Sequence, residues 1–114
     1  MKNILFICSQ NKLRSPTAET VFLDNPNINV LSAGLNNNAV EVVSVDLVEW
    51  ADVIFVMEKT HKNKLLKKFK KHIKDQRLIC LNIPDNYEYM DPELVEIFKT
   101  RIPRFLENIN KNVV

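Results

Sequence analysis

The sequence contains very little glycine and very little cysteine. Gly34 is the only glycine among 114 residues, and Cys8 and Cys80 are the only cysteines. Two cysteines cannot build the disulfide framework of a small secreted scaffold. Fourteen residues are asparagine, the residue that most readily replaces glycine where the backbone needs a positive φ. We therefore expect asparagines at turns and loop corners, namely Asn11, Asn25, residues 36–38, Asn82 and Asn86.

Long apolar runs are absent as well. The longest, residues 4–8 and 53–57, have five residues each. A transmembrane helix needs about 20 apolar residues and the core of a signal peptide about 7–15. With 46% hydrophobic and 26% charged residues, the chain has the composition of an ordinary globular protein. We expect one domain, residues 1–114, in the cytoplasm and without a membrane partner.

Basic residues are concentrated in one segment. Between Lys59 and Lys74 the chain has eight of its sixteen basic residues and no acidic residue, whereas the rest has eight basic and fourteen acidic residues. The apolar residues of this segment share one side of a helix, which leaves the lysines on the other; they are Leu65, Leu66, Phe69 and Ile73. A solvated helix face is the favoured interpretation. His61 and His72 have no companions at metal-ligand spacing, so we expect no metal.

Four short apolar runs rich in β-branched residues predict buried strands. They cover residues 4–7, 28–31, 53–57 and 78–81. They lack polar alternation, which favours a parallel sheet covered on both faces. Helix-like segments lie between them. The sequence therefore predicts an α/β fold, a three-layer sandwich around a four-stranded parallel sheet. Cys80 falls in the last run and is expected in the core.

Two helices have recognisable beginnings. Ser15 is a plausible N-cap, since Pro16 would then hold the first helical position, and the pair Asp91 and Pro92 repeats this arrangement. A short helix is expected within residues 42–50. The final helix has one apolar face, made of Leu94, Phe98, Ile102, Phe105 and Ile109. Pro103 interrupts this pattern, and we expect a kink or break near Ile102.

The chemistry is concentrated in the loop of residues 8–14, which follows the first predicted strand. Ligands of open α/β sheets bind beyond the carboxyl ends of the strands, and a loop that enters a helix presents backbone N–H groups to an anion. Arg14 supplies a planar fork that matches two phosphate oxygens. Cys8 shares this positive environment, which favours the nucleophilic thiolate. Ser15 can donate a hydrogen bond to the sulfur, and Asn11 can adopt a left-handed conformation.

Cys8 to Ser15, followed by residues 16–19, resembles the phosphate loop of the low-molecular-weight protein tyrosine phosphatases. Further similar segments follow in order, namely residues 32–34, residues 51–58 with His61, and residues 84–87. The resemblance implies that Cys8 is the nucleophile and forms a phosphocysteine, that Arg14 and the loop amides hold the phosphoryl group, and that an Asp is the general acid. It implies no cofactor. Asn11, Ser15 and Ser32 match positions that organise the loop.

This chain departs from the family pattern in several places. It is shortened between Ala33 and Ala51, where the family has an extra helix and loop beside the substrate cleft. Gln10 replaces the usual loop glycine, and Leu13 replaces a second loop cysteine. In the family's run of Asp, Pro and two aromatic residues, Asn86 stands in place of the proline.

Two carboxylates compete for the role of general acid. Asp91 precedes a proline, as the family's acid does, but the residues after it indicate a helix start, where backbone N–H groups would occupy its carboxylate. Asp85 follows the last predicted strand in a loop, two residues before Tyr87, an aromatic that matches a cleft-wall position. We therefore assign Asp85 as the acid.

The leading hypothesis is a phosphomonoester hydrolase, similar to the tyrosine phosphatases, that acts on a substrate such as a phosphotyrosine protein. Its expected catalytic residues are Cys8, Arg14 and Asp85. Its expected substrate-binding residues are Ser9, Gln10, Asn11, Lys12, Leu13, Ser15 and Tyr87. The alternative is a non-catalytic module that binds phosphate or RNA through the loop and the basic helix, although its lysines are not interleaved with aromatics, which disfavours nucleic acid. Arsenate reduction is less favoured, because it needs further cysteines.

Overall fold

All four predicted strands form, and they pair in parallel. The computed structural model describes residues 2–111. Its single sheet contains β1 (Lys2–Cys8), β2 (Ile28–Gly34), β3 (Val53–Val56) and β4 (Arg77–Cys80) in the order β2-β1-β3-β4. The sheet therefore extends from β1 to β2 on one side and to β3 and β4 on the other. The resulting switch point, where ligands of open α/β sheets bind, lies at the carboxyl ends of β1 and β3.

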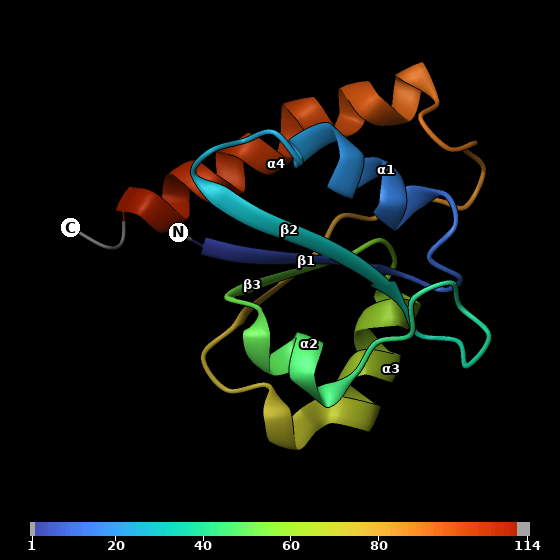
Figure 1. Ribbon diagram of the computed structural model, residues 1–114, viewed down its shortest axis with the longest axis vertical. Coiled ribbons are helices and arrows are strands. Elements are labelled where there is room, and N and C mark those ends of the chain that lie inside the picture. The colour runs from blue at the N-terminus through green and yellow to red at the C-terminus, as the bar shows by residue number, and fades with distance from the viewer. Residues whose placement is uncertain (1, 112–114) are drawn as a thin grey trace.

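Helices cover both faces of the sheet, as the three-layer prediction requires (Figure 1). One face carries α1 (Arg14–Phe22) and α4 (Pro92–Lys111). The other carries α2 (Val45–Trp50), α3 (Lys59–Phe69) and the adjoining 3₁₀ turn η1 (Lys70–His72). No helix within residues 2–111 is long and apolar enough to cross a membrane.

The central strand β1 supplies both cores. Ile4, Phe6 and Cys8 belong to the cluster under α1 and α4, whereas Leu5 and Ile7 belong to the cluster under α2 and α3. Successive side chains of a strand point to opposite faces, so a strand covered on both sides is apolar throughout. This explains why the run carried no polar alternation, and it fixes Cys8 at the end of a rigid, buried strand.

Of the helix starts predicted at Ser15 and Asp91, only the one at Asp91 is confirmed. Asp91 does cap α4, because its Oδ1 accepts a hydrogen bond from the Glu93 N–H at 2.9 Å. The N-cap assignment of Ser15 is wrong. α1 begins one residue earlier, at Arg14, with Leu13 in the cap position and no side-chain cap bond. The Ser15 hydroxyl is buried and bonded to Cys8 instead. The expected helix in residues 42–50 is the shorter α2, capped by Ser44.

Of the kink or break predicted near Ile102, the break does not occur, since α4 continues through Pro103 to Lys111. Leu94, Phe98 and Ile102 are all fully buried, and Phe105 packs edge-on against Phe55 at a centroid distance of 5.8 Å. Burial of this face on both sides of the proline offsets the helix-interior penalty of about 3 kcal/mol. The side chain of Ile109 lies outside the residues whose side chains the structure describes.

Cys80, expected in the core, is half-buried and packs against the core cluster under α2 and α3 without being one of its buried members. β4 is an edge strand, and the Cys80 thiol donates to Asn82 Oδ1 at 3.4 Å. The pattern of an apolar run does not distinguish a central strand from an edge strand, because both have at least one covered face.

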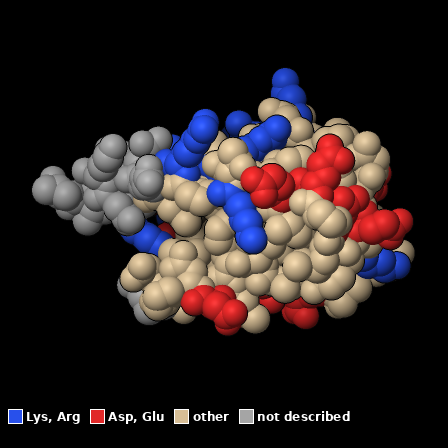
Figure 2. Space-filling model, turned by 90° about the horizontal axis from the view of Figure 1, so that it is seen from above, with Lys and Arg blue, Asp and Glu red and all other residues tan. Residues whose placement is uncertain are grey.

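Charge is distributed unevenly over the surface. In the basic segment Leu65 and Phe69 are buried, and all its lysines except the half-buried Lys62 are exposed, in agreement with a solvated face. On the opposite side of the molecule, acidic side chains gather over the beginning of α4 and basic ones over its later part (Figure 2). This order complements the dipole of the helix.

The φ of Gly34 is not positive, so its backbone conformation does not require a glycine. Close packing does. A Cβ built at this position would lie 2.6 Å from Ala39 Cβ, 2.6 Å from the Ser9 carbonyl oxygen and 3.0 Å from the Asn11 nitrogen. Two of these atoms are backbone of the loop after β1, which cannot rotate away as a side chain can.

We expect Gly34→Ala to lower the free energy of unfolding by about 1–3 kcal/mol, the usual cost of overpacking. Thermal unfolding of the variant and the wild type measures this. The double variant Gly34→Ala/Ala39→Gly should recover only part of the loss, because the contact with the loop backbone remains. An unchanged melting temperature for Gly34→Ala would contradict the packing described.

Candidate active site

The loop after β1 is held from outside by the segment of residues 35–40. The carbonyls of Cys8, Ser9 and Gln10 accept hydrogen bonds of 3.0 Å each from amides of that segment. Asn11 then reverses the chain with a φ of 54°, in the left-handed region, as predicted from its residue type. This turn directs the Asn11 N–H to Cys8 Sγ at 3.2 Å. The loop therefore curves around the sulfur.

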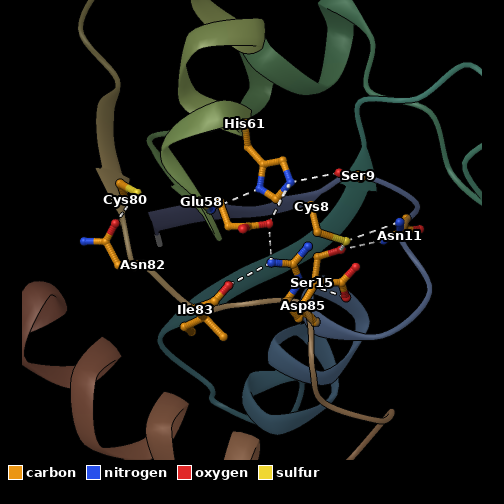
Figure 3. A network of polar contacts seen from close by, with 11 residues as sticks. Cys8, Ser9, Asn11, Ser15, Glu58, His61, Cys80, Asn82, Ile83 and Asp85 are labelled. Carbon is orange, nitrogen blue, oxygen red and sulfur yellow. Dashed lines mark hydrogen bonds and ion pairs between the residues drawn. The ribbon is translucent and has the colours of Figure 1, made fainter.

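A directed chain of hydrogen bonds ends at the Cys8 sulfur (Figure 3). The Asn11 side-chain amide donates to Ser15 Oγ at 3.0 Å and to Ser32 Oγ at 2.9 Å. Ser32 in turn donates to Glu19 Oε1. Because Ser15 Oγ accepts from Asn11, its own hydrogen is free for Cys8 Sγ, 3.0 Å away. Two donors thus face the sulfur, an arrangement that stabilises a thiolate.

Arg14 is buried, with 3% of its side chain exposed, and is held in place by one of its nitrogens. Nη1 donates to Glu58 Oε2 and to the Ile83 carbonyl, both at 2.7 Å. Among the described residues, Nε and Nη2 have no hydrogen-bond partner. These two nitrogens form one edge of the guanidinium, the edge that binds a phosphoryl group with two parallel hydrogen bonds.

The two candidate acids lie in different surroundings. Asp85 lines the hollow above Cys8, 65% exposed, with its Oδ1 3.7 Å from Arg14 Nε. Asp91 is engaged as the cap of α4. Tyr87 is half-buried against the core under α1 and α4 and is not among the residues that line the hollow. The structure thus brings Asp85 to the predicted site but leaves Tyr87 outside it.

The hollow at the site is small, about 90 Å³, which suits a phosphoryl-sized group. Its lining consists of Cys8, Ser9, Gln10, Lys12, Leu13, Arg14 and Asp85. Asn11 and Ser15 lie beneath it and act through the sulfur. A larger hollow of about 490 Å³ lies at the amino ends of β1, β3 and β4, among exposed charges of both signs. Ligands of parallel sheets bind at the carboxyl ends, which excludes this larger hollow. A third hollow, of about 330 Å³, lies after β3 and β4, but of the three only the hollow of about 90 Å³ is lined by a cysteine, and it is the candidate site.

Sequence reasoning gave no role to Glu58 or His61, which complete the site. Glu58 follows β3 and caps α3, and His61 lies three residues later, 2% exposed, with Nε2 2.9 Å from Ser9 Oγ. Burial, reinforced by the charge of Arg14, lowers the pKa of His61 to about 4. The available signal was an acidic residue at the carboxyl end of a strand beside the loop of residues 8–14, with a histidine at the fourth position of a capping box.

Neither a family model nor a curated protein sequence matches the chain. Solved structures do match. The YwlE arginine phosphatase from Geobacillus stearothermophilus superposes with a TM-score of 0.80 at 20% identity, over 98% of this chain and 95% of that one.

Two further structures agree with this. For SP-PTP, the low-molecular-weight protein tyrosine phosphatase from Streptococcus pyogenes, the TM-score is 0.76 at 16% identity, over 95% and 93% of the two chains. For Wzb from Vibrio vulnificus in complex with benzylphosphonate, it is 0.67 at 23% identity, over 86% and 90%. The chain therefore has the fold of the low-molecular-weight phosphatases, as its loop motif predicted.

Proposed function

We propose that the protein hydrolyses phosphomonoesters through a phosphocysteine formed on Cys8. The observation that carries this proposal is the arrangement around one sulfur. Cys8 Sγ faces the Ser15 hydroxyl and the Asn11 amide beneath a phosphoryl-sized hollow, and Arg14 lines the same hollow. Each group has a part in phosphoryl transfer, and no other hollow described contains a nucleophile with such partners.

In the first step the Cys8 thiolate attacks phosphorus. The P–S bond forms, the bond to the leaving oxygen breaks, and Asp85 donates its proton to that oxygen. Arg14 and the loop amides bind the equatorial oxygens, on which charge accumulates in the transition state. In the second step water attacks phosphorus, Asp85 accepts a proton from it, and the P–S bond breaks. Inorganic phosphate leaves and the thiolate is restored.

Two kinds of leaving group are to be distinguished, an oxygen and a nitrogen. SP-PTP is a tyrosine phosphatase and YwlE an arginine phosphatase, and both have the fold of this chain. An aryl ester agrees with the loop motif and is the substrate we propose. Comparison of a phosphotyrosine peptide with a phosphoarginine peptide of the same sequence decides between a P–O and a P–N bond.

A disulfide relay of the arsenate reductase kind fits the geometry poorly. Cys80 lies on β4, two strands from β1. With about 4.8 Å between neighbouring strands, its Cα is about 10 Å from that of Cys8. A disulfide needs a Cα separation below about 7 Å.

The decisive experiment is turnover of p-nitrophenyl phosphate. We expect turnover that vanadate inhibits and that Cys8→Ser abolishes, because an alcohol at this position is a far weaker nucleophile than a thiolate. Cys80→Ser is the matched control and should keep wild-type rates. Absence of turnover, together with salt-sensitive RNA binding, would instead favour the non-catalytic module.

Arg14→Lys should lower kcat by about 10²–10³-fold, since a point charge cannot reproduce two parallel hydrogen bonds to the phosphoryl oxygens. Steady-state kinetics on p-nitrophenyl phosphate measures this, with circular dichroism to verify folding. Near-wild-type turnover would mean that the Nε–Nη2 edge of the guanidinium is not used.

Asp85→Ala should slow esters with poor leaving groups by about 10²-fold or more and those with good leaving groups far less, because only poor leaving groups need a proton. Asp91→Ala should leave this dependence unchanged and lower stability by about 1 kcal/mol through loss of the helix cap. A series of aryl phosphates of graded leaving-group pKa tests both variants. The reverse pattern would transfer the role of acid to Asp91.

A further inference from the structure

The buried ring of His61 joins the phosphate loop to the start of α3 (Figure 3). Its Nδ1 lies 3.0 Å from the backbone nitrogen of Glu58, and its Nε2 lies 2.9 Å from Ser9 Oγ. A backbone N–H can only donate, so Nδ1 must be the acceptor and carries no proton. The proton of the neutral ring is therefore on Nε2, which donates to Ser9.

The same surroundings keep the ring neutral. A second proton on Nδ1 would face the Glu58 N–H, donor against donor. The charged groups around the ring are Arg14 and Lys64, which oppose its protonation, and Glu58 and Asp85, which favour it. Burial is the largest effect and lowers the pKa of His61 to about 4, so one tautomer persists near neutral pH.

The fixed tautomer has a consequence for Ser9. A serine hydroxyl has one hydrogen and can either donate or accept toward a ligand. Here the oxygen already accepts from His61, so the hydrogen remains available for another partner. Ser9 directly follows the nucleophile and lines the same small hollow as Cys8 and Arg14. A residue that lines the hollow thus carries a hydroxyl hydrogen that its contact with His61 does not use.

We propose that Ser9 is a side-chain ligand of the phosphoryl group, and that His61 is the positioning residue that makes its hydroxyl a hydrogen-bond donor. This inference rests on the proposed function and deepens it. A phosphoryl group presents only acceptor oxygens, and their charge grows in the transition state. A donor held in place before the substrate arrives therefore contributes mainly to kcat.

Ser9→Ala tests the ligand role on p-nitrophenyl phosphate. We expect kcat to fall about 10- to 100-fold, the usual effect of losing a hydrogen bond to a charged group. The affinity for inorganic phosphate, measured by calorimetry, should also fall. Ser9→Thr keeps a hydroxyl and should recover most of the loss. Ser44→Ala, which removes a serine hydroxyl at the start of α2, is the control and should leave kcat unchanged.

A double-mutant cycle separates positioning by His61 from a merely structural role. His61→Leu should lower kcat about tenfold in the wild-type background and have no further effect in Ser9→Ala, since it acts through that hydroxyl. His61→Gln, whose amide can still donate to Ser9, should recover most of the loss. Equal losses from His61→Leu in both backgrounds would overturn the positioning role. If His61→Leu does not fold, His61→Phe takes its place in the same cycle, because a phenyl ring fills much of the same space but cannot donate to Ser9.

The ligand role is overturned if Ser9→Ala keeps both wild-type kcat and wild-type phosphate affinity. Calorimetry also separates this inference from the proposed function. A wild-type protein that hydrolyses no phosphate compound but binds inorganic phosphate with Ser9-dependent affinity would refute the hydrolase and retain the ligand role. A protein that neither hydrolyses nor binds phosphate would refute both.

Discussion

The site depends on the ion pair between Arg14 and Glu58. A guanidinium that is 3% exposed is costly without a partner, and Glu58 together with the Ile83 carbonyl supplies that partner through one nitrogen. The pair joins the loop after β1 to the end of β3. The backbone of Glu58 also fixes the ring of His61. One residue at the switch point of the sheet thus orients both sides of the hollow.

Much of this architecture could be predicted from residue patterns. The four strands, the loop that begins at Cys8 and the cap at Asp91 each depend on neighbours within a few positions, where periodicity and cap chemistry are informative. The left-handed turn at Asn11 belongs to the same class, because residue type alone limits which φ a position tolerates. The loop motif, finally, led to the correct fold.

The errors concern contacts between distant parts of the chain. The cap assigned to Ser15 is an exception, since Cys8 and Asn11, which engage its hydroxyl, are only seven and four positions away. Glu58 and Arg14 are 44 positions apart, and only the order of the strands brings them together. Pro103 was assigned its local penalty without the burial that offsets it. Local patterns were thus sufficient to predict the helices and strands, whereas the position of Glu58 beside Arg14 depended on tertiary packing.

The hydrogen bonds between residues 35–40 and the loop of residues 8–14 join two stretches of chain into one cooperative unit. Three amides of that segment donate hydrogen bonds to successive carbonyls of the loop. The segment and the loop also pack so closely around Gly34 that a Cβ there would clash with both. A fluctuation that releases any one of these amides to solvent must also loosen the loop around Cys8. Amide hydrogen exchange at Leu35, Asn36 and Val40 therefore reports on how often Cys8 loses its ordered surroundings, although none of these three residues lines the hollow.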